Sequence, residues 1–341
     1  MGASMKIALV HRRFTTNGGT ERYLVGLARH LVGEGHDVNV LCNEVRPDLQ
    51  GEPGVRFVYL PMWRPAKAMS LAWSARRAIR QGSYDAVMGL GRHSGHHLYR
   101  AGGGSHVDYL RRAHPLRRWF SPSDWVDVAL DRYAVRSARV VLANSELGAR
   151  ALRADYGAAR VEVIYNGVDL TRFKPDPQVR SAVRHELGAT GNVAVFLGND
   201  FARKGLDIAI AALPAHWALW VVGGDRPVPA PARVRFLGVQ ALPERFLQGA
   251  DAMMLPTRYD PFANVCLEAM ACGIPVLTSA ANGASEVVPE SWMICESPAD
   301  YTLALERITP DLGTRCRAVA ESFPPEGSYR RALQLLIEAA A

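Results

Sequence analysis

Two acidic residues stand eight positions apart in the stretch RYDPFANVCLEAMACGIPV, residues 258–276. Asp260 precedes a Pro-Phe pair, and Glu268 falls within residues 261–271, where the sequence predicts a helix. A rise of about 1.5 Å per residue puts the two carboxylates roughly 12 Å apart at most. A glycosidase pair needs about 5 to 10 Å between its carboxyl groups. The spacing therefore favours two acids that hold the two ends of one extended, polyhydroxylated ligand.

The predicted helix that carries Glu268 offers further contacts to a ligand. The amides near Asn264 and Val265 open this helix, and Glu268 can accept hydrogen bonds from a diol such as a ribose. The alternative is a solvent-facing glutamate. The neighbours of Glu268 are apolar, however, which indicates that much of the helix is buried. Because a buried carboxylate requires partners, we favour a binding role for Glu268.

A basic pair, Arg203 and Lys204, stands at the expected start of a second helix, residues 203–213. Basic side chains beside unpaired backbone amides form a clamp for a diphosphate. Two merely solvated cations would be disfavoured there, because a helix N-terminus carries a partial positive charge. The pair therefore predicts an anionic ligand.

A glycine pair, Gly18 and Gly19, lies in NGGTER at residues 17–22, where a strand is expected to turn into a helix. Glycine lets backbone amides approach a phosphate or sugar closely. Ordinary tight turns use the same residues, so this motif alone is weak evidence for binding.

The elements that must position these residues form two similar series. Apolar runs alternate with helical patterns, which predicts parallel sheets with helices on both faces. A Pro-containing polar stretch, residues 167–177, predicts a linker between the series. We expect an α/β fold of two Rossmann-like, doubly wound domains, residues 1–168 and 169–326, facing across a cleft that holds the ligand. A helix at 327–341 is free to pack back on the first domain. The expected strands are 6–11, 37–42, 55–60, 85–90, 138–144, 160–166, 193–198, 219–224, 234–238, 251–256 and 274–279.

The composition is that of an ordinary globular protein, with 48% hydrophobic and 21% charged residues among 341. No stretch approaches the roughly 18 apolar residues of a membrane span, and no signal-peptide pattern opens the chain. The five cysteines lack metal-ligand spacing, which favours reduced, buried thiols in a cytoplasmic protein.

Residues 1–168 carry 24 Lys and Arg against 14 Asp and Glu, whereas residues 169–341 carry 16 against 19. We therefore expect the first domain to face an anionic partner.

Three stretches of the chain form a recognisable pattern. They are VIYNGVDLTRFKP at 163–175, RKG at 203–205, and Asp260 followed by EAMACGIPVLTSAANGASEVV at 268–288. This pattern resembles the retaining glycosyltransferases of family 4, and the resemblance covers nearly the whole chain. It implies the two-Rossmann-domain fold called GT-B. The family usually has Glu at the position of Asp260, so the acidic side chain at this position is one methylene group shorter in this chain.

The resemblance implies a role for each residue of the second half. Arg203 and Lys204 would neutralise the diphosphate leaving group, Glu268 would hold the ribose, and Asp260 would hold hydroxyls of the transferred sugar. The amides at 264–265 would face the phosphates or the sugar. No metal or other cofactor is implied, because Arg and Lys take the place of a metal. In the first half, the glycine pair would lie against the donor near its phosphate.

The stretch LYRAGGGSH, residues 98–106, resembles the corresponding part of lipopolysaccharide-core-type sugar transferases. An acidic residue often occupies the place of Gly103 in that group, so a side chain expected near the reacting centre is absent. His97 and His106 are candidate substitutes, because histidine exchanges protons near neutral pH. A single histidine is more often structural, and the donor phosphate is another candidate base.

A basic and aromatic segment, residues 108–125, follows directly. Clustered arginines among aromatic side chains predict contact with anionic lipid headgroups, and residues 63–80 could extend this patch. The alternative is an ordinary solvated loop. No nucleic-acid-binding motif accompanies the charges, so we expect no nucleic-acid partner. The patch residues are Arg111, Arg112, Arg117, Arg118 and Trp119.

These features predict a metal-independent enzyme bound peripherally at the inner face of the cytoplasmic membrane. It would move a sugar with retention from a nucleotide-diphosphate donor, a UDP-sugar being favoured, to a lipid-linked or lipopolysaccharide-core-type saccharide. The alternative is a catalytically weak or silent sugar-nucleotide-binding or scaffold protein of the same fold, because of Gly103. An epimerase or a phosphorylase of this fold is disfavoured, since none of the four lysines lies in a recognisable pyridoxal phosphate setting.

Overall fold

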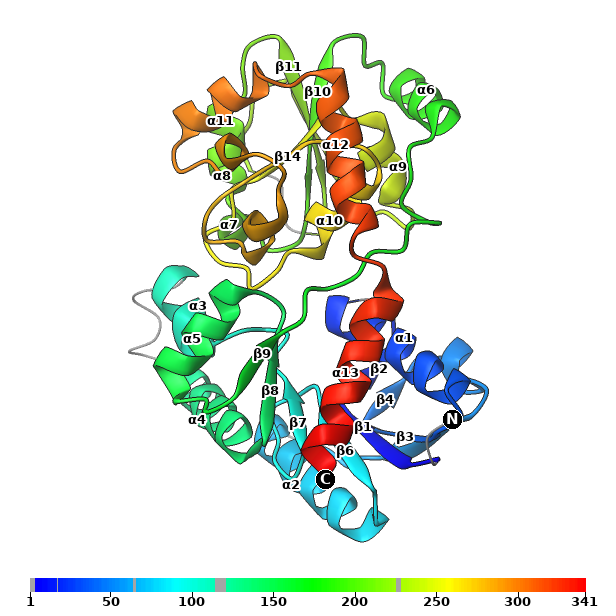
Figure 1. The fold of residues 1–341 in the computed structure, drawn as a ribbon. Helices are drawn as coiled ribbons and strands as arrows, with labels where there is room; N and C mark the ends of the chain where they lie inside the picture. Colours follow the sequence, from blue (N-terminus) through cyan, green and yellow to red (C-terminus); the bar gives the residue numbers. More distant parts are fainter. Residues whose placement is uncertain (1–3, 17, 64–65, 114–120, 225–227) are drawn as a thin grey trace. The chain divides into compact units, whose positions relative to one another are not determined.

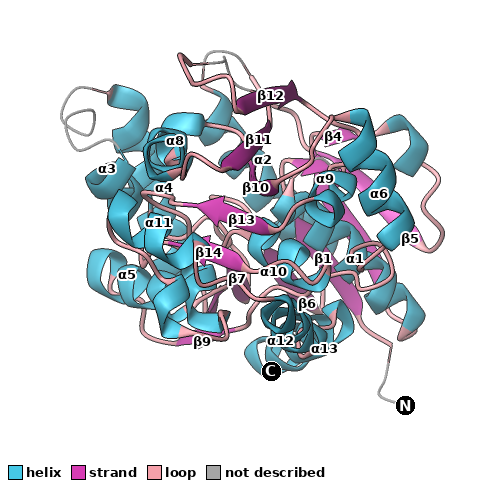
Figure 2. Ribbon diagram, turned by 90° about the horizontal axis from the view of Figure 1, so that it is seen from above, coloured by secondary structure: helices cyan, strands magenta, loops and turns pink. Residues whose placement is uncertain are grey.

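We describe the fold from a computed structural model, which describes residues 4–16, 18–63, 66–113, 121–224 and 228–341. The chain divides into two compact units, Met1–Tyr165 with Pro325–Ala341, and Asn166–Pro324 (Figure 1). These boundaries lie slightly before the ones expected from the linker, 168 and 326. Figures 1 and 2 show strands flanked by helices in both units. The cleft between the domains stays a prediction.

The first unit is built on a parallel seven-stranded sheet of order β5-β3-β1-β6-β7-β8-β9. The central strand β1 pairs with β3 on one side and with β6 on the other. A short parallel pair, β2 (Arg13–Phe14) and β4 (Glu44–Val45), extends beyond β1 and β3. The sheet strands are β1 (Lys6–Val10), β3 (Asp37–Cys42), β5 (Val55–Tyr59), β6 (Ala86–Gly89), β7 (Leu98–Arg100), β8 (Val140–Ala143) and β9 (Val161–Val163). The helices are α1 (Gly19–Gly33), η1 (Pro47–Leu49), α2 (Lys67–Gly82), α3 (His106–Ala113), α4 (Pro122–Ser137), α5 (Glu146–Tyr156) and α13 (Pro325–Ala340).

Strand periodicity explains the layers of the first unit. Successive residues of β1 point to opposite faces of the sheet. Ile7 and Leu9 therefore pack in a cluster with α1 and α13, while Ala8 and Val10 pack in another with α2. The last helix of the chain thus completes the core of the first unit.

The second unit is built on a parallel five-stranded sheet of order β12-β11-β10-β13-β14. Its strands are β10 (Asn192–Leu197), β11 (Trp217–Val222), β12 (Val234–Gly238), β13 (Ala252–Leu255) and β14 (Val276–Thr278). Its helices are α6 (Pro177–Glu186), α7 (Phe201–Lys204), α8 (Leu206–Ala212), α9 (Glu244–Gly249), α10 (Asn264–Ala271), η3 (Gly283–Val287), η4 (Ser291–Met293), α11 (Pro298–Leu305) and α12 (Pro310–Glu321). The α/β class and the two parallel sheets confirm the predicted fold class.

Two expected helices differ from the structure. The helix predicted at 203–213 is broken at Gly205, whose φ of +76° is left-handed and where a Cβ would lie 2.0 Å from the carbonyl oxygen of Pro256. Only glycine fits this close approach. Arg203 and Lys204 consequently end the short helix α7 instead of opening a longer one. The helix predicted at 261–271 begins at Asn264, so that Asp260 lies in the loop before it.

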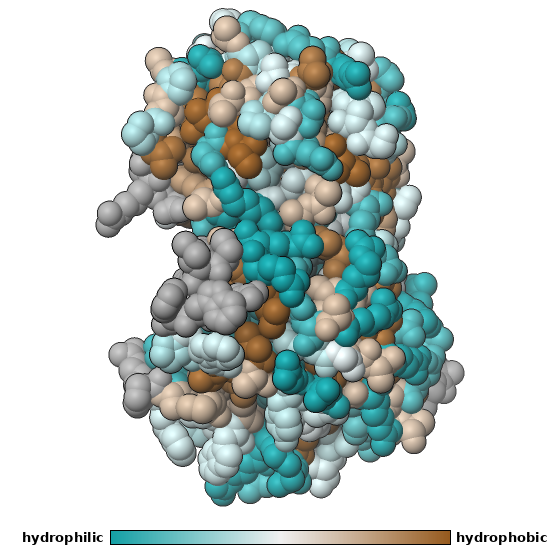
Figure 3. All heavy atoms as spheres, turned by 90° about the vertical axis from the view of Figure 1, so that its left-hand side faces the viewer, coloured by the Kyte–Doolittle hydropathy of each residue, from teal (hydrophilic) through white to brown (hydrophobic). Residues whose placement is uncertain are grey.

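The surface agrees with the expectation for a globular protein. Hydrophilic and hydrophobic side chains are interspersed on the face drawn in Figure 3. Among the described residues, no helix is both long and apolar enough to cross a membrane. All five cysteines are free and buried, as expected from their spacing.

The core position of α13 generates a stability prediction. We expect Leu335→Ala to destabilise the first unit by about 2 to 5 kcal/mol, because Leu335 is fully buried and its truncation leaves a cavity. Faster hydrogen exchange of β1 and β6 amides measures the loss. Ile337→Ala on the same helix is the control, since Ile337 is 42% exposed and should cost less than about 0.5 kcal/mol. Equal effects of the two variants would contradict the packing described.

Candidate functional site

The second unit brings three residues singled out in the sequence into one cluster. Lys204 Nζ lies 2.5 Å from Asp260 Oδ2, and Arg203 Nη1 lies 3.3 Å from the same oxygen. The side chains of Lys204 and Asp260 are only 9% and 13% exposed. Two cations from α7 thus share one carboxylate oxygen in a nearly buried setting.

Backbone contacts fix the two cations against the loop that follows β13. The carbonyl oxygen of Arg203 accepts from the amide of Arg258 at 2.8 Å and from the hydroxyl of Thr257 at 3.1 Å. Arg203 Nη1 donates to the carbonyl oxygen of Tyr259 at 2.9 Å, and Arg203 Nε donates to Asp200 at 3.0 Å. Because α7 and this loop sit at the carboxyl ends of neighbouring parallel strands, the cluster lies where ligands bind in such sheets.

The cluster has a definite electrostatic consequence for Asp260. Burial alone would raise the pKa of this carboxyl group, but Lys204, Arg203 and the amide of Phe262 outweigh it and hold the pKa below its ordinary value. Ionised Asp260 therefore stabilises the folded unit above its unfolded-state pKa of about 3.9, and this contribution is lost as the pH falls through the lower folded-state value.

A buried asparagine, Asn282, joins this loop to the start of α10. Its Oδ1 accepts from the amides of Ala263 and Ala284, each at 3.1 Å, and its Nδ2 donates to Thr278 Oγ1 at 2.9 Å. Residue 282 also pairs with residue 260 in an isolated parallel bridge. Asn282 thus positions Asp260 and α10 together, a role that we did not infer from the sequence.

The helix α10 carries the remaining predicted donor-binding residues. No side chain caps it at Ala263, so the first-turn amides at Asn264 and Val265 have no cap acceptor. The side chain of Asn264 accepts from Asn166 Nδ2 at 2.6 Å. Glu268 is buried on the same helix, as its apolar neighbours indicated.

The glycine pair lies at the start of α1 in the first unit. Gly18 is the N-cap residue and Gly19 the first helical residue. Glu21 fills the space beside Gly18, where a Cβ would lie 2.2 Å from its Oε2. The pKa of Glu21 is lowered chiefly by a hydrogen bond from His11. The predicted contact of Gly18 and Gly19 with a donor phosphate stays a prediction.

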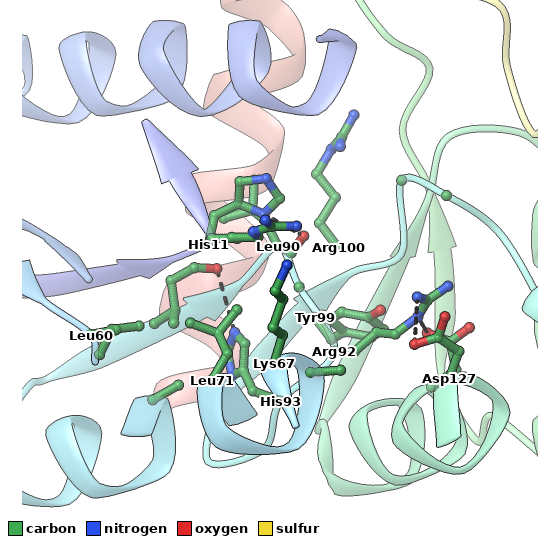
Figure 4. Close-up of a pocket in the computed structure, with 18 of the residues that line it drawn as sticks. His11, Leu60, Lys67, Leu71, Leu90, Arg92, His93, Tyr99, Arg100 and Asp127 are labelled. Carbon is green, nitrogen blue, oxygen red and sulfur yellow. Dashed lines mark hydrogen bonds and ion pairs between the residues drawn. The ribbon is translucent and has the colours of Figure 1, made fainter. Parts of the chain in front are cut away.

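A pocket of about 420 Å³ lies within the first unit, at the carboxyl ends of β1 and β6 (Figure 4). Its apolar lining includes Leu60, Leu71 and Leu90. Basic residues also line it, and we did not predict them as a group from the sequence. They are His11, Arg12, Lys67, Arg92, His93 and Arg100. His11 ends the strand predicted at 6–11, Arg12 follows it, and Arg92 lies two residues after the strand predicted at 85–90. These positions at strand ends are the pattern that could have identified them. Lys67 comes from a distant helix and had no such pattern.

Arg92 organises the acidic side of this pocket. Its guanidinium pairs with Asp131 at 2.8 Å and with Asp127 at 3.2 Å. Burial alone would lower the pKa of Arg92, but these two carboxylates outweigh it and the pKa is raised. Burial also raises the pKa of Asp131, against the effect of Arg92.

The two candidate histidines are held by neighbouring groups. Arg92 donates to Nδ1 of His106 at 3.2 Å, and Nε2 of His106 lies 3.1 Å from Asp124. A guanidinium can only donate, so Nδ1 of His106 is the acceptor in this contact. His97 accepts from the amide of Val87 at 3.2 Å, and burial is the main cause that lowers its pKa. A role of either histidine in proton transfer stays a prediction.

His106, Asp124 and Asp127 place one ligand atom each within 4.8 Å of one another, a spacing that could hold a metal ion. The guanidinium of Arg92 contacts both His106 and Asp127, however, and supplies the positive charge at this place. The donor set therefore fits an ion-pair network better than a metal. The absence of a metal requirement stays a prediction.

The predicted membrane patch is described in part. Arg111 pairs with Asp155 at 2.9 Å and with Asp108 at 3.2 Å, and Arg112 pairs with Asp108 at 2.9 Å. These two arginines are therefore neutralised within the first unit. Arg117, Arg118 and Trp119 lie outside the described residues.

Two parallel, doubly wound sheets in sequence define the class of this protein, the GT-B fold. The model "Glycosyltransferase Family 4" matches residues 17–172, and the model "Glycosyl transferases group 1" matches residues 191–311. The chain therefore contains a region that matches glycosyltransferase family 4, followed by one that matches glycosyl transferases group 1, which confirms the resemblance that the sequence motifs indicated.

Similar proteins support this assignment over nearly the whole length. A protein of Burkholderia thailandensis named as a probable transglycosylase is 28% identical over 97% of this chain and 92% of its own. The crystal structure of WaaG, a glycosyltransferase involved in lipopolysaccharide biosynthesis, superposes with a TM-score of 0.82 at 18% identity, covering 97% of this chain and 99% of that one. HepE of Anabaena, in complex with UDP and glucose, gives 0.74 at 21% identity, covering 98% and 100%. At these identities the two structures show the fold.

The Lys204–Asp260 pair generates a titration prediction. We expect Lys204→Met to raise the pKa of Asp260, because the burial that opposes ionisation remains while one compensating cation is removed. Carbon-13 NMR of the labelled aspartate carboxyl groups measures the shift. Lys174→Met, at an exposed position of the same unit, should leave it unchanged. An Asp260 resonance that titrates identically in wild type and Lys204→Met would refute the electrostatic account.

Proposed function

We propose that this protein transfers a sugar, with retention and without a metal, from a UDP-sugar to a saccharide or glycolipid acceptor of lipopolysaccharide-core type. The observation that carries the proposal is the convergence of Arg203, Lys204 and Asp260 at the carboxyl end of the second sheet. The preference for UDP is supported by the UDP complex of HepE, and the acceptor class by the lipopolysaccharide role of WaaG.

In the proposed reaction the bond between C1 of the sugar and the diphosphate oxygen breaks. The oxygen of an acceptor hydroxyl forms the new bond to C1 on the same face, and the hydroxyl proton passes to the departing diphosphate. Lys204 and Arg203 stabilise the negative charge that develops on the leaving group. A bound diphosphate competes with Asp260 for these cations, so that Asp260 becomes available to hydroxyls of the sugar.

The nucleoside part of the donor is assigned to the same unit. Glu268 accepts hydrogen bonds from the ribose hydroxyls, and the amides of Asn264 and Val265 face the phosphates or the sugar. Val239, which is 78% exposed, and Leu242 offer apolar surface to the base after β12. Large apolar side chains left in water are suited to cover the face of a ring.

The acceptor is assigned to the pocket of the first unit. Its volume of about 420 Å³ matches a small saccharide portion. Gly103 lines this pocket, at a position where the family often has an acidic residue. This observation favours the alternative function, a catalytically weak or silent binding protein, over an active transferase. The donor phosphate is the base in our proposal, so that turnover does not depend on a side chain at position 103.

We further propose that the outer face of α2 contacts an anionic membrane. Arg111 and Arg112 are assigned no such contact, because both are paired within the first unit. The exposed residues of α2 recur at intervals of three or four positions and so form one helical face. The ring of Trp73 lies 5.8 Å from that of Trp63, and the guanidinium of Arg77 lies 5.6 Å from it. Aromatic side chains beside arginines are typical of headgroup contacts. The exposed face comprises Met69, Trp73, Arg76, Arg77 and Arg80, with Trp63 beside it.

A donor assay tests the proposed reaction. We expect Lys204→Ala to lower the rate of UDP-sugar hydrolysis or transfer by about 10²- to 10³-fold, because leaving-group charge is no longer stabilised. Glu268→Ala should weaken donor binding. A panel of nucleotide sugars, followed by release of the free nucleotide, measures both. Arg245→Gln removes an exposed ion pair with Glu186 in the same unit and serves as the control. Donor use that neither Lys204→Ala nor Glu268→Ala alters would rule the proposal out.

Co-sedimentation with lipid vesicles tests the membrane face. We expect wild type to bind vesicles rich in phosphatidylglycerol and to be released by salt, since the attraction is screened. Replacing both Trp63 and Trp73 by alanine should reduce the bound fraction several-fold. Leu303→Ala, at an exposed apolar position of the second unit, is the matched control. Loss of binding in Arg111→Gln but not in the tryptophan variant would place the contact elsewhere.

A further inference from the structure

The pocket of the first unit has a charge distribution that sugar transfer alone does not require. Four Lys or Arg residues line it, against two aspartates. Both aspartates, Asp127 and Asp131, pair with the same cation, Arg92. Both acidic residues of the lining therefore pair with one of its four cations.

Two of the remaining cations have neighbours of their own. Arg100 is buried with its guanidinium 3.8 Å from the ring centre of Tyr23, where the face of the ring is negative. His11 lies 3.0 Å from the carbonyl oxygen of Leu90 through Nδ1, and its Nε2 faces Glu21 at 3.7 Å. These contacts account for both side chains within the unit.

Arg12 and Lys67 are different. Both are exposed, and neither forms an ion pair with any residue in the described part of the chain. Arg12 follows the carboxyl end of β1, whereas Lys67 opens α2, so two separate elements direct a cation to one pocket. In the view of Figure 4, the Lys67 side chain extends from α2 toward His11.

We propose that the acceptor carries an anionic group, a phosphate or a carboxylate, and that Arg12 and Lys67 bind it in this pocket. The assignment of the bound molecule as acceptor rests on the proposed function, whereas the binding itself does not. Charge-assisted hydrogen bonds to such a group are short and strong, and an arginine can bind two oxygens at once. The apolar wall formed by Leu60, Met62, Leu71 and Leu90 contacts the face of the attached ring.

Gly103 belongs to the same inference. A Cβ at this position would meet no atom within 4 Å, and its φ is not among the positive values of the described residues. Neither space nor backbone conformation therefore requires glycine here. An acidic side chain would offset one of the uncompensated cations of the lining. Its absence keeps the pocket cationic, as an anionic acceptor needs.

Calorimetric titration of the full chain tests the inference with glucose, glucose 6-phosphate, glucuronate and inorganic phosphate as probes. We expect the two charged sugars to bind about tenfold more tightly than glucose, because each gains charge-assisted hydrogen bonds. Arg12→Gln and Lys67→Gln should each remove most of this preference. Gly103→Asp should also weaken binding of the charged sugars by repulsion. Phosphatidylinositol micelles form a separate arm, and tighter binding there than to glucose 6-phosphate identifies a lipid as the source of the anion.

Arg13→Gln is the matched control, because Arg13 neighbours Arg12 in sequence but pairs with Glu44 at 3.4 Å. Equal affinity for glucose and glucose 6-phosphate would overturn the inference, as would equal losses in Arg12→Gln and Arg13→Gln. An unchanged thermal unfolding curve and far-ultraviolet circular dichroism spectrum of each variant verify that the first unit is folded. If donor turnover occurs without any preference for anions, the inference alone fails. If the charged sugars bind as expected but no donor is used, the proposed function alone fails.

Discussion

A nearly buried ion pair, Lys204 with Asp260, is the constraint on which the second unit depends. A carboxylate removed from water is costly unless other groups replace its hydration. Here Lys204, Arg203 and the amide of Phe262 replace the hydration of the Asp260 carboxylate. The backbone of α7 and of the loop before α10 must stay in place for these groups to reach it. Removing one partner of such a pair costs about 3 to 5 kcal/mol, because it leaves the other charge uncompensated. The pair thus holds α7 and the loop before α10 in register.

The two units differ in how their cations are paired. This difference fits our proposal that the second unit binds the donor and the first unit binds the acceptor. In the second unit the cations at the strand ends already share an internal carboxylate, which an incoming diphosphate can displace. In the first unit, Arg92 pairs with both aspartates of the pocket lining. Arg12 and Lys67 therefore form no ion pair in the described structure. The overall excess of positive charge in the first half of the sequence therefore has a local cause, in addition to an exposed basic helix face on α2.

Strong local patterns were sufficient to predict most strands of the two large sheets, whereas the short strands β2, β4 and β7 were missed. The strands at 37–42 and 234–238 match β3 and β12, because unbroken apolar runs with clear flanks leave little choice of bounds. Arg203, Lys204 and Asp260 were each singled out through their motifs, but their pairing with one another was not predicted. The break at Gly205 was not, since its cause is contact with Pro256, far along the chain. The contacts of His106 were not predicted for a similar reason: Arg92 and Asp124 hold its ring, and only the folded chain brings them together.

The return of α13 to the first unit has a consequence for how the chain matures in the cell. Ala332, Leu335, Leu336 and Ala339 fill the same core as β1, which precedes them by more than 300 residues in the chain. The second unit is one continuous segment and can close its core as soon as it emerges from the ribosome. The first unit cannot seal its apolar interior until α13 has been synthesised. We therefore expect the second unit to complete its core before the first, although most of the first unit precedes it in the chain.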